Sequence, residues 1–325
     1  MEEFEHLPIE IGRMIAHAEA ALHVTPHPVQ RQPRVMEHLV TRHVARHGSA
    51  GPDDETYARN LSAGLLRTIE TLERSPGMFD SGLGKSLLNV RAHLATDPDA
   101  SELRTWEAVV TALQVHSALF AASDRTEGHV LCHIAEEMRS IPATRPTRSA
   151  NPGHWINAFW LAIVCRDQAR MTQLCTVSLE LLRVSRARYD EFMFDWVDTL
   201  QSYWDERPGL GGKLIATIEG SHPDVARVAE KELIDKILYQ PVNLFHLFVR
   251  KDHAGFNQAL FEAVELHKSY WTATAERGAS VEGYLALGPL AITCLAFDAG
   301  FPIEVESDYL PAHLLNRSWV GEFTT

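Results

Sequence analysis

The residues most capable of chemistry in this chain are histidines, of which there are 17 among 325 residues. The best-spaced group reads His129-x-x-Cys132-His133-x-x-x-Glu137. Residues four apart lie on one face of a helix, so His129, His133 and Glu137 would present two nitrogens and a carboxylate together. A catalytic zinc site needs three such ligands and one open position. The group therefore suggests a metal-dependent enzyme, against the simpler interpretation of surface or capping histidines.

Other catalytic signatures are incomplete. The H-E-x-x-H motif of zinc proteases is missing, and no G-x-S-x-G motif marks a Ser-His-Asp hydrolase. The glycine-rich segment G-L-G-K-S at residues 82–86 lacks the G-x-x-x-x-G-K-[ST] spacing of a phosphate loop. We expect it to be a loop that leads into a helix over residues 87–94.

Composition limits the classes of partner. The formal net charge is −13, whereas a general nucleic-acid binder carries the opposite sign. The acidity favours a basic protein partner, with solubility alone as the alternative. The aromatic residues Phe192, Trp196 and Tyr203 follow helical spacing and are expected in the core rather than on a base-stacking surface.

The positions of apolar residues predict an all-α fold. Helical periodicity dominates, and short turns between apolar helices are typical of antiparallel helical hairpins packed as a bundle, partly like a solenoid. The central element is predicted at residues 151–165, where Asn151 can cap a helix that opens with Pro152 and is apolar on all sides. A second buried helix is predicted near residues 289–297.

Further elements follow from the same patterns. Asp167, Asp252 and Asp298 each stand in a turn after an apolar helix, where we expect them to cap the next helix. Residues 302–307 alternate like a short strand, although no partner strand is visible. The other predicted helices cover residues 9–24, 33–44, 53–72, 101–120 and 130–138.

The domain organisation and compartment are predicted as follows. A segment with two prolines and two arginines, residues 140–150, would link an N-terminal helical subdomain (1–139) to a C-terminal helical-hairpin subdomain (151–325), unless both form one domain. None of the four cysteines forms a C-x-x-C pair, which indicates reduced thiols. With neither a signal peptide nor a membrane-spanning apolar run apparent, we expect a cytoplasmic protein without a membrane partner.

Several motifs carry a family resemblance. They are N-P-G-H-W-x-N-A-F-W-L-A from Asn151, C-R-D-x-A-R-M from Cys165, W-V-D-T-L-Q-S-Y-W, E-R-P-G-L, F-N-x-A-L-x-E-A-V-E-L-H-K-x-Y-W, A-L-G-P-L-A and D-A-G-F-P-I-E-V-E-S-D-Y-L-P. Across residues 151–323 the chain resembles the immunity protein 49 family of actinobacterial polymorphic-toxin systems. The resemblance implies an all-α intracellular protein, encoded beside a secreted toxin, that binds and neutralises that toxin without a cofactor.

The toxin contacts would lie outside the matched motifs' apolar and turn residues, on exposed acidic groups. In one mode of inhibition, an acidic helical surface of this protein would cover a basic active site of the toxin. The candidates, chosen because they cluster near turns and loop ends, are Asp205, Glu206, Glu304, Glu306 and Asp308. The alternatives are the metal-dependent enzyme and a helical scaffold for a partner other than a toxin.

Overall fold

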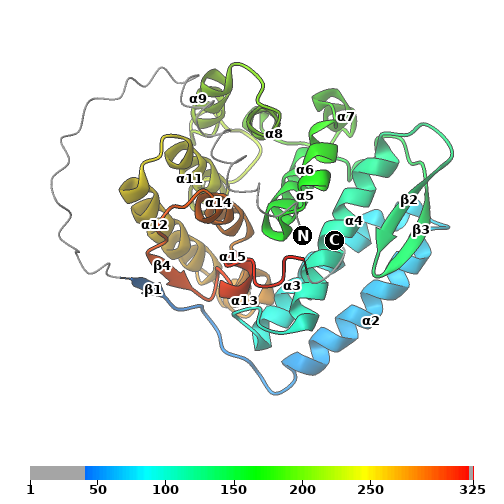
Figure 1. Cartoon of the computed structure of the whole chain (residues 1–325), viewed down its shortest axis with the longest axis horizontal. Helices are drawn as coiled ribbons and strands as arrows, with labels where there is room; N and C mark the ends of the chain where they lie inside the picture. The colour runs from blue at the N-terminus through cyan, green and yellow to red at the C-terminus, as the bar shows by residue number, and fades with distance from the viewer. Residues whose placement is uncertain (1–40, 322–324) are drawn as a thin grey trace.

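The computed structural model describes residues 41–321 and Thr325, and helices dominate that part of the chain (Figure 1). The predicted all-α class is confirmed. The predicted helix at residues 9–24, and the part of the 33–44 helix before residue 41, lie outside the described residues. The elements are β1 (Arg42–Val44), α2 (Asp54–Leu72), η1 (Pro76–Met78), α3 (Phe79–Thr96), α4 (Leu103–Ser123), β2 (His129–Ile134), β3 (Glu137–Pro142), α5 (Pro152–Cys165), α6 (Gln168–Cys175), α7 (Leu179–Val184), α8 (Glu191–Trp204), α9 (Leu210–Gly220), α10 (Lys231–Leu233), η2 (Ile234–Leu238), α11 (Tyr239–Val249), α12 (His253–Trp271), α13 (Ala275–Gly278), η3 (Val281–Tyr284), α14 (Leu287–Asp298), β4 (Val305–Ser307) and α15 (Ala312–Leu315).

The helices pack pairwise around α5 and α14. In Figure 1, α2, α3, α4 and the β2–β3 hairpin form one side, α8, α9, α11 and α12 form the other, and α5 and α14 lie between them. Helix α5 contacts α4, α6, α8 and α14, while α14 also packs on α11. One hydrophobic core cluster contains residues from both sides of residues 140–150, such as Leu113 and Phe159. The division into two subdomains stays a prediction.

Helix α5 is the buried central helix that its sequence predicts. The Asn151 side chain accepts a hydrogen bond from the His154 backbone N–H, and Pro152 occupies the first helical position. Trp155 is fully buried, stacks on Phe159 with ring centroids 4.9 Å apart, and donates its indole N–H to the Leu174 carbonyl. The cap of the helix and the buried indole N–H of Trp155 thus both have partners, so their burial leaves no unpaired donor.

Helix α14 is the second predicted buried helix. The segment Val281–Asp298 has the length and apolar composition of a membrane span, but 72% of it is buried inside the protein. That segment consists of η3 and α14, which pack on α3, α5 and α11. A core helix explains its composition.

The three Asp-containing turns divide into two kinds. Asp167 and Asp252 cap α6 and α12, accepting hydrogen bonds from the backbone N–H groups of Arg170 and Gly255. The prediction for Asp298 is wrong, because Asp298 is the last residue of α14 and caps no helix. Its carboxylate instead forms a buried ion pair with Arg166, in which Nε and Oδ2 are 2.9 Å apart.

Two predictions near the ends of the described chain have different outcomes. The helix predicted over residues 33–44 is wrong where it is described, because residues 42–44 form strand β1. The short strand predicted within residues 302–307 is confirmed as β4, and it has a partner, because β1 pairs with it in parallel. Val44 is buried by this pairing, and Arg46 donates to the carbonyl groups of Leu94 and Ala95. The partner was not visible in the sequence because it lies about 260 positions away.

The middle of the N-terminal half departs from prediction at three places. Residues 130–138 belong to the antiparallel hairpin β2–β3 and not to a helix. The glycine-rich residues 82–86 lie inside α3, which begins at Phe79, so they form no loop. Part of the predicted linker is strand, since β3 includes Ser140, and Ile141 is fully buried.

Candidate functional site

A surface groove of about 570 Å³ lies between α2, α3, α4 and the tip of the β2–β3 hairpin. Its volume falls in the range of ligand sites, roughly 300–1,000 Å³. Apolar contributions come from Leu66, Trp106 and Val110. The polar residues of its lining are Arg59, Ser62, Asn89, His93, Arg104, Glu107, Thr111, Gln114, His133 and Glu136.

The hairpin turn is held in place by a buried glutamine. Only Ala135 and Glu136 separate the strands, and both have positive φ values, 52° and 64°. Positive φ at both positions is the pattern of a type I′ turn, which favours Asn-Gly over such residues. The Gln114 side chain, buried on α4, accepts the Ala135 N–H at 3.0 Å. Helix α4 thereby fixes a strained turn that places Glu136 in the groove lining.

Two carboxylates line the groove without a counter-ion. Among the described residues, neither Glu107 nor Glu136 forms an ion pair. Loss of hydration raises the pKa of Glu107, and the negative charge of Glu136 raises it further. Two like charges that oppose each other in this way would be stabilised by a cation brought into the groove.

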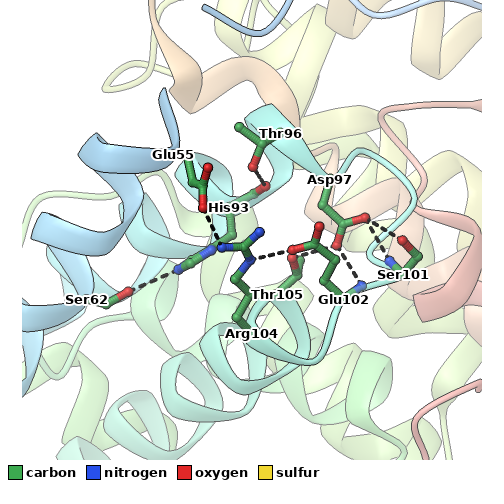
Figure 2. Close-up of polar contacts among 9 residues, drawn as sticks. All are labelled: Glu55, Ser62, His93, Thr96, Asp97, Ser101, Glu102, Arg104 and Thr105. Carbon is green, nitrogen blue, oxygen red and sulfur yellow. Dashed lines mark hydrogen bonds and ion pairs between the residues drawn. The ribbon is translucent and has the colours of Figure 1, made fainter. Parts of the chain in front are cut away.

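A serine and a histidine also meet here, as Figure 2 shows. Ser62 Oγ and His93 Nε2 are 3.0 Å apart, the distance of a nucleophile and its base. Ser62 Oγ also lies 2.9 Å from Asn89 Oδ1 and 3.1 Å from the Ala58 carbonyl, so its one proton has competing acceptors. Burial lowers the pKa of His93, and the charge of Arg104 lowers it further.

The third member of a triad does not join this pair. Asp97, one turn after His93, accepts hydrogen bonds from Ser101 Oγ at 2.9 Å and Thr105 Oγ1 at 2.7 Å, and from the backbone N–H groups of Ser101 and Glu102. In Figure 2 its carboxylate points toward these groups and away from the His93 ring. These bonds lower the pKa of Asp97 despite its burial. Asp97 therefore anchors the start of α4 and leaves the Ser62–His93 pair without an orienting carboxylate.

An ion-pair network closes one end of the groove. Arg104 pairs with Glu102 on its own side and, at 3.1 Å, with Glu55 at the start of α2 (Figure 2). All three side chains are exposed to solvent by 41% or more. Pairs at this exposure contribute about 0–1 kcal/mol each, so the network orients the groove rim more than it stabilises the fold.

The three predicted metal ligands do not meet. His129 and His133 lie on a strand, where residues four apart are separated by roughly 13 Å along the chain. His133 contacts Gln114, and Glu137 pairs with Arg139 at 2.9 Å. In the described part of the chain no three His, Cys, Asp or Glu side chains are placed to hold a metal ion. The segment in which a helix would align these ligands forms the β2–β3 hairpin instead.

The five acidic candidates fall into two separate places. Glu304, Glu306 and Asp308 lie on or beside β4, next to the basic strand β1. Asp308 accepts the Arg46 backbone N–H at 3.3 Å. Asp205 and Glu206 follow α8, which is distant from β4 in Figure 1, and Asp205 pairs with Arg207.

Sequence reasoning missed the groove itself. His93 and Glu107 sit in ordinary amphipathic helices, and Glu136 sits in a turn that lacks Asn or Gly. The one available signal was D-P-D-A-S-E-L-R-T at residues 97–105, where Asp97 and Ser101 precede the predicted helix start. That signal indicates a cap, not a binding site.

The fold and the groove define an all-α protein of packed helices with two unpaired carboxylates in a surface hollow. Residues 97–314, about two thirds of the chain, match Immunity protein 49. The chain therefore belongs to the immunity protein 49 family, as its motifs indicated. No curated protein and no solved structure matches it.

Proposed function

We propose that this protein binds a cognate secreted toxin in the cytoplasm and neutralises it by covering a basic active site. Membership of an immunity-protein family supports a toxin partner. The net charge of −13 supports a basic one, since charge complementarity speeds association and excludes wrong partners. Inhibition of this kind needs a complementary surface and no reactive group or cofactor.

The observation that carries this proposal is the unpaired carboxylate pair in the groove. A lysine or arginine of the toxin that enters between Glu107 and Glu136 would relieve their repulsion and form charge-assisted hydrogen bonds. Apolar side chains beside the groove would bury against the toxin at the same time. On the outer face of the hairpin, Leu131 is 70% exposed and Met138 is 63% exposed, and Leu66 of the groove is 44% exposed.

A second acidic surface belongs to the same proposal. Glu304, Glu306 and Asp308 would meet the toxin from β4, and Asp205 with Glu206 from the end of α8. Asp205 is paired with Arg207, and Arg42 and Arg46 lie beside β4. In the groove, which Arg59 and Arg104 also line, Glu107 and Glu136 form no ion pair among the described residues. For this reason we expect the groove to contribute more to toxin binding than these five residues do.

The test is calorimetric titration with the toxin encoded by the neighbouring gene, at low and high salt. We expect tight one-to-one binding that weakens with salt. Glu107→Gln with Glu136→Gln should weaken binding by about tenfold to a thousandfold, because the toxin's cation then lies unpaired in the interface. Glu219→Gln, an exposed glutamate on α9, is the matched control and should bind like wild type.

A charge-reversal pair separates the two surfaces. Glu304→Lys with Glu306→Lys should slow association and reduce its salt dependence if β4 faces the toxin. Unchanged kinetics for this pair, with a loss for the groove pair, would assign the interface to the groove alone. Absence of toxin binding, together with capture of another folded protein, would favour the scaffold function instead.

A further inference from the structure

A second hollow, of about 560 Å³, lies on the other side of α3 and is open to solvent where exposed residues such as Val228 and Glu282 line it. It is bounded by α3, α5, α8, η2, α11, α12 and the start of α14. Most of its walls are apolar, with the indoles of Trp160, Trp196 and Trp271 among them. Its volume suits a small molecule, and it is separate from the groove because the two share no lining residue.

One permanent cation of α3, Arg91, lines this cavity. Its Nε is shielded from solvent and has no hydrogen-bond partner. Within residues 41–321 its guanidinium forms no ion pair, and burial lowers its pKa. An arginine stays charged nonetheless and presents five N–H donors in a planar fork. Arg91 as a whole is partly exposed, since only its Nε is fully shielded, and its remaining N–H donors are therefore available to an anion in the cavity.

The acidic groups near Arg91 compensate its charge only in part. Asp190 is occupied by three backbone N–H groups, those of Arg227, Val228 and Ala229, at 2.5–2.9 Å. Glu282 also lines the cavity, and its charge partly offsets the effect of burial on the pKa of Arg91, but it is exposed and forms no ion pair with Arg91. Lys236, which also lines the cavity, is already paired with Glu232 at 3.1 Å and so adds little net charge.

Two helix N-termini add to the positive potential. The first turn of α5, with Gly153 and His154, and the first turn of α14, with Gly288, both line the cavity. Each of these helices has 12 residues or more. The N-terminus of a helix carries about half a positive charge, although here the His154 N–H is already bonded to Asn151, and Pro152 and Pro289 have no N–H.

We propose that this cavity is a binding site for a small carboxylate with an apolar, preferably aromatic, body. The carboxylate would accept the paired N–H groups of Arg91, which is the bidentate geometry that a guanidinium favours. The apolar body would lie against Trp160 and Trp196. This site does not depend on the proposed toxin binding, because the cavity and the groove lie on different sides of α3.

The test is thermal unfolding and calorimetric titration of the full chain with 1-naphthoate, benzoate and inorganic phosphate. We expect 1-naphthoate to bind best, to raise Tm with concentration, and to quench tryptophan fluorescence. The uncharged 1-naphthamide should bind about tenfold or more weakly, because it cannot form charge-assisted hydrogen bonds with Arg91. If phosphate binds as tightly as 1-naphthoate, the apolar walls do not contribute to binding, and the proposal of an apolar ligand body is overturned.

Variants identify the residue responsible. Arg91→Met should abolish the Tm shift while the free protein stays at least as stable as wild type, because an apolar side chain replaces an unpaired charge. Arg91→Lys should retain weaker binding, since it keeps the charge and loses the fork. Arg125→Met, an exposed arginine outside the cavity, is the matched control. The proposal is overturned if none of the three anions binds, or if 1-naphthoate binds Arg91→Met as tightly as wild type.

Discussion

Replacing Asp298 by alanine should destabilise this protein more than any loss of a surface ion pair. The Arg166 and Asp298 side chains are only 2% and 4% exposed, and Arg166 Nε donates to Asp298 Oδ2 at 2.9 Å. The other Arg166 nitrogens donate to the carbonyls of Leu314 at 2.8 Å and Leu315 at 2.7 Å. The pair therefore joins α5, α14 and α15, and Asp298→Ala leaves the guanidinium buried without its counter-charge.

The magnitude follows from that burial. Removing one member of a buried ion pair costs about 3–5 kcal/mol of the free energy of unfolding, because the remaining charge is uncompensated. For a chain of this size the corresponding fall in Tm is about 4–10 °C. Asp298→Asn keeps the shape and one acceptor oxygen, so its cost should be smaller, and it provides a second measurement if the alanine variant does not fold.

The assay is urea unfolding at pH 7, with Glu191→Ala as the matched control. Glu191 pairs with Arg183 at the surface, where the two side chains are 63% and 40% exposed. Loss of that pair should cost about 1 kcal/mol or less. The reasoning is refuted if Asp298→Ala and Glu191→Ala lower the free energy of unfolding by the same amount.

Two further predictions concern pH and the hairpin turn. Burial lowers the pKa of His267 to about 4, while the unfolded chain takes up that proton near 6.5, so the free energy of unfolding should fall as pH decreases from 6.5 toward 4. His267→Gln keeps a donor for the Gly283 carbonyl. In urea unfolding at a series of pH values, it should reduce the change in the free energy of unfolding by about 1.4 kcal/mol per pH unit. A pH dependence equal to that of wild type would contradict this. Gln114→Ala leaves the Ala135 N–H unpaired, which should cost about 1–3 kcal/mol and speed hydrogen exchange in the hairpin. Protection equal to wild type would show that the turn does not need Gln114.

The parts of the fold that the sequence predicts are those fixed by local patterns. Helix α5 is recognisable because its cap, its proline and its apolar run all lie within 15 consecutive residues. The hairpin is not recognisable in the sequence, because the spacing of His129, His133 and Glu137 fits the period of a helix and that of a strand. The turn also carries no Asn-Gly signal. Its conformation depends on Gln114, which lies 21 positions from Ala135. Asp298 was misassigned for the same reason, since its partner Arg166 is 132 positions away.

The candidate sites depend even more on distant contacts. The groove combines Ser62, His93, Glu107 and Glu136 from four elements, and none of these residues stands in a motif. Arg91 is indistinguishable in sequence from a surface arginine of an amphipathic helix. Only the packing of α3 against the C-terminal half shows that its guanidinium faces a cavity.

The pairing of β1 with β4 also has a kinetic consequence. The hydrogen-bonded residues are separated by about 260 positions, so the two strands close a loop that contains nearly all the helices. Closing a loop of that length has a large entropic cost, and such contacts form late unless the chain between them has already folded. During synthesis β1 must wait until residue 307 has emerged. For that interval β1 is an exposed strand edge, and its charged residue Arg42 opposes pairing with other chains.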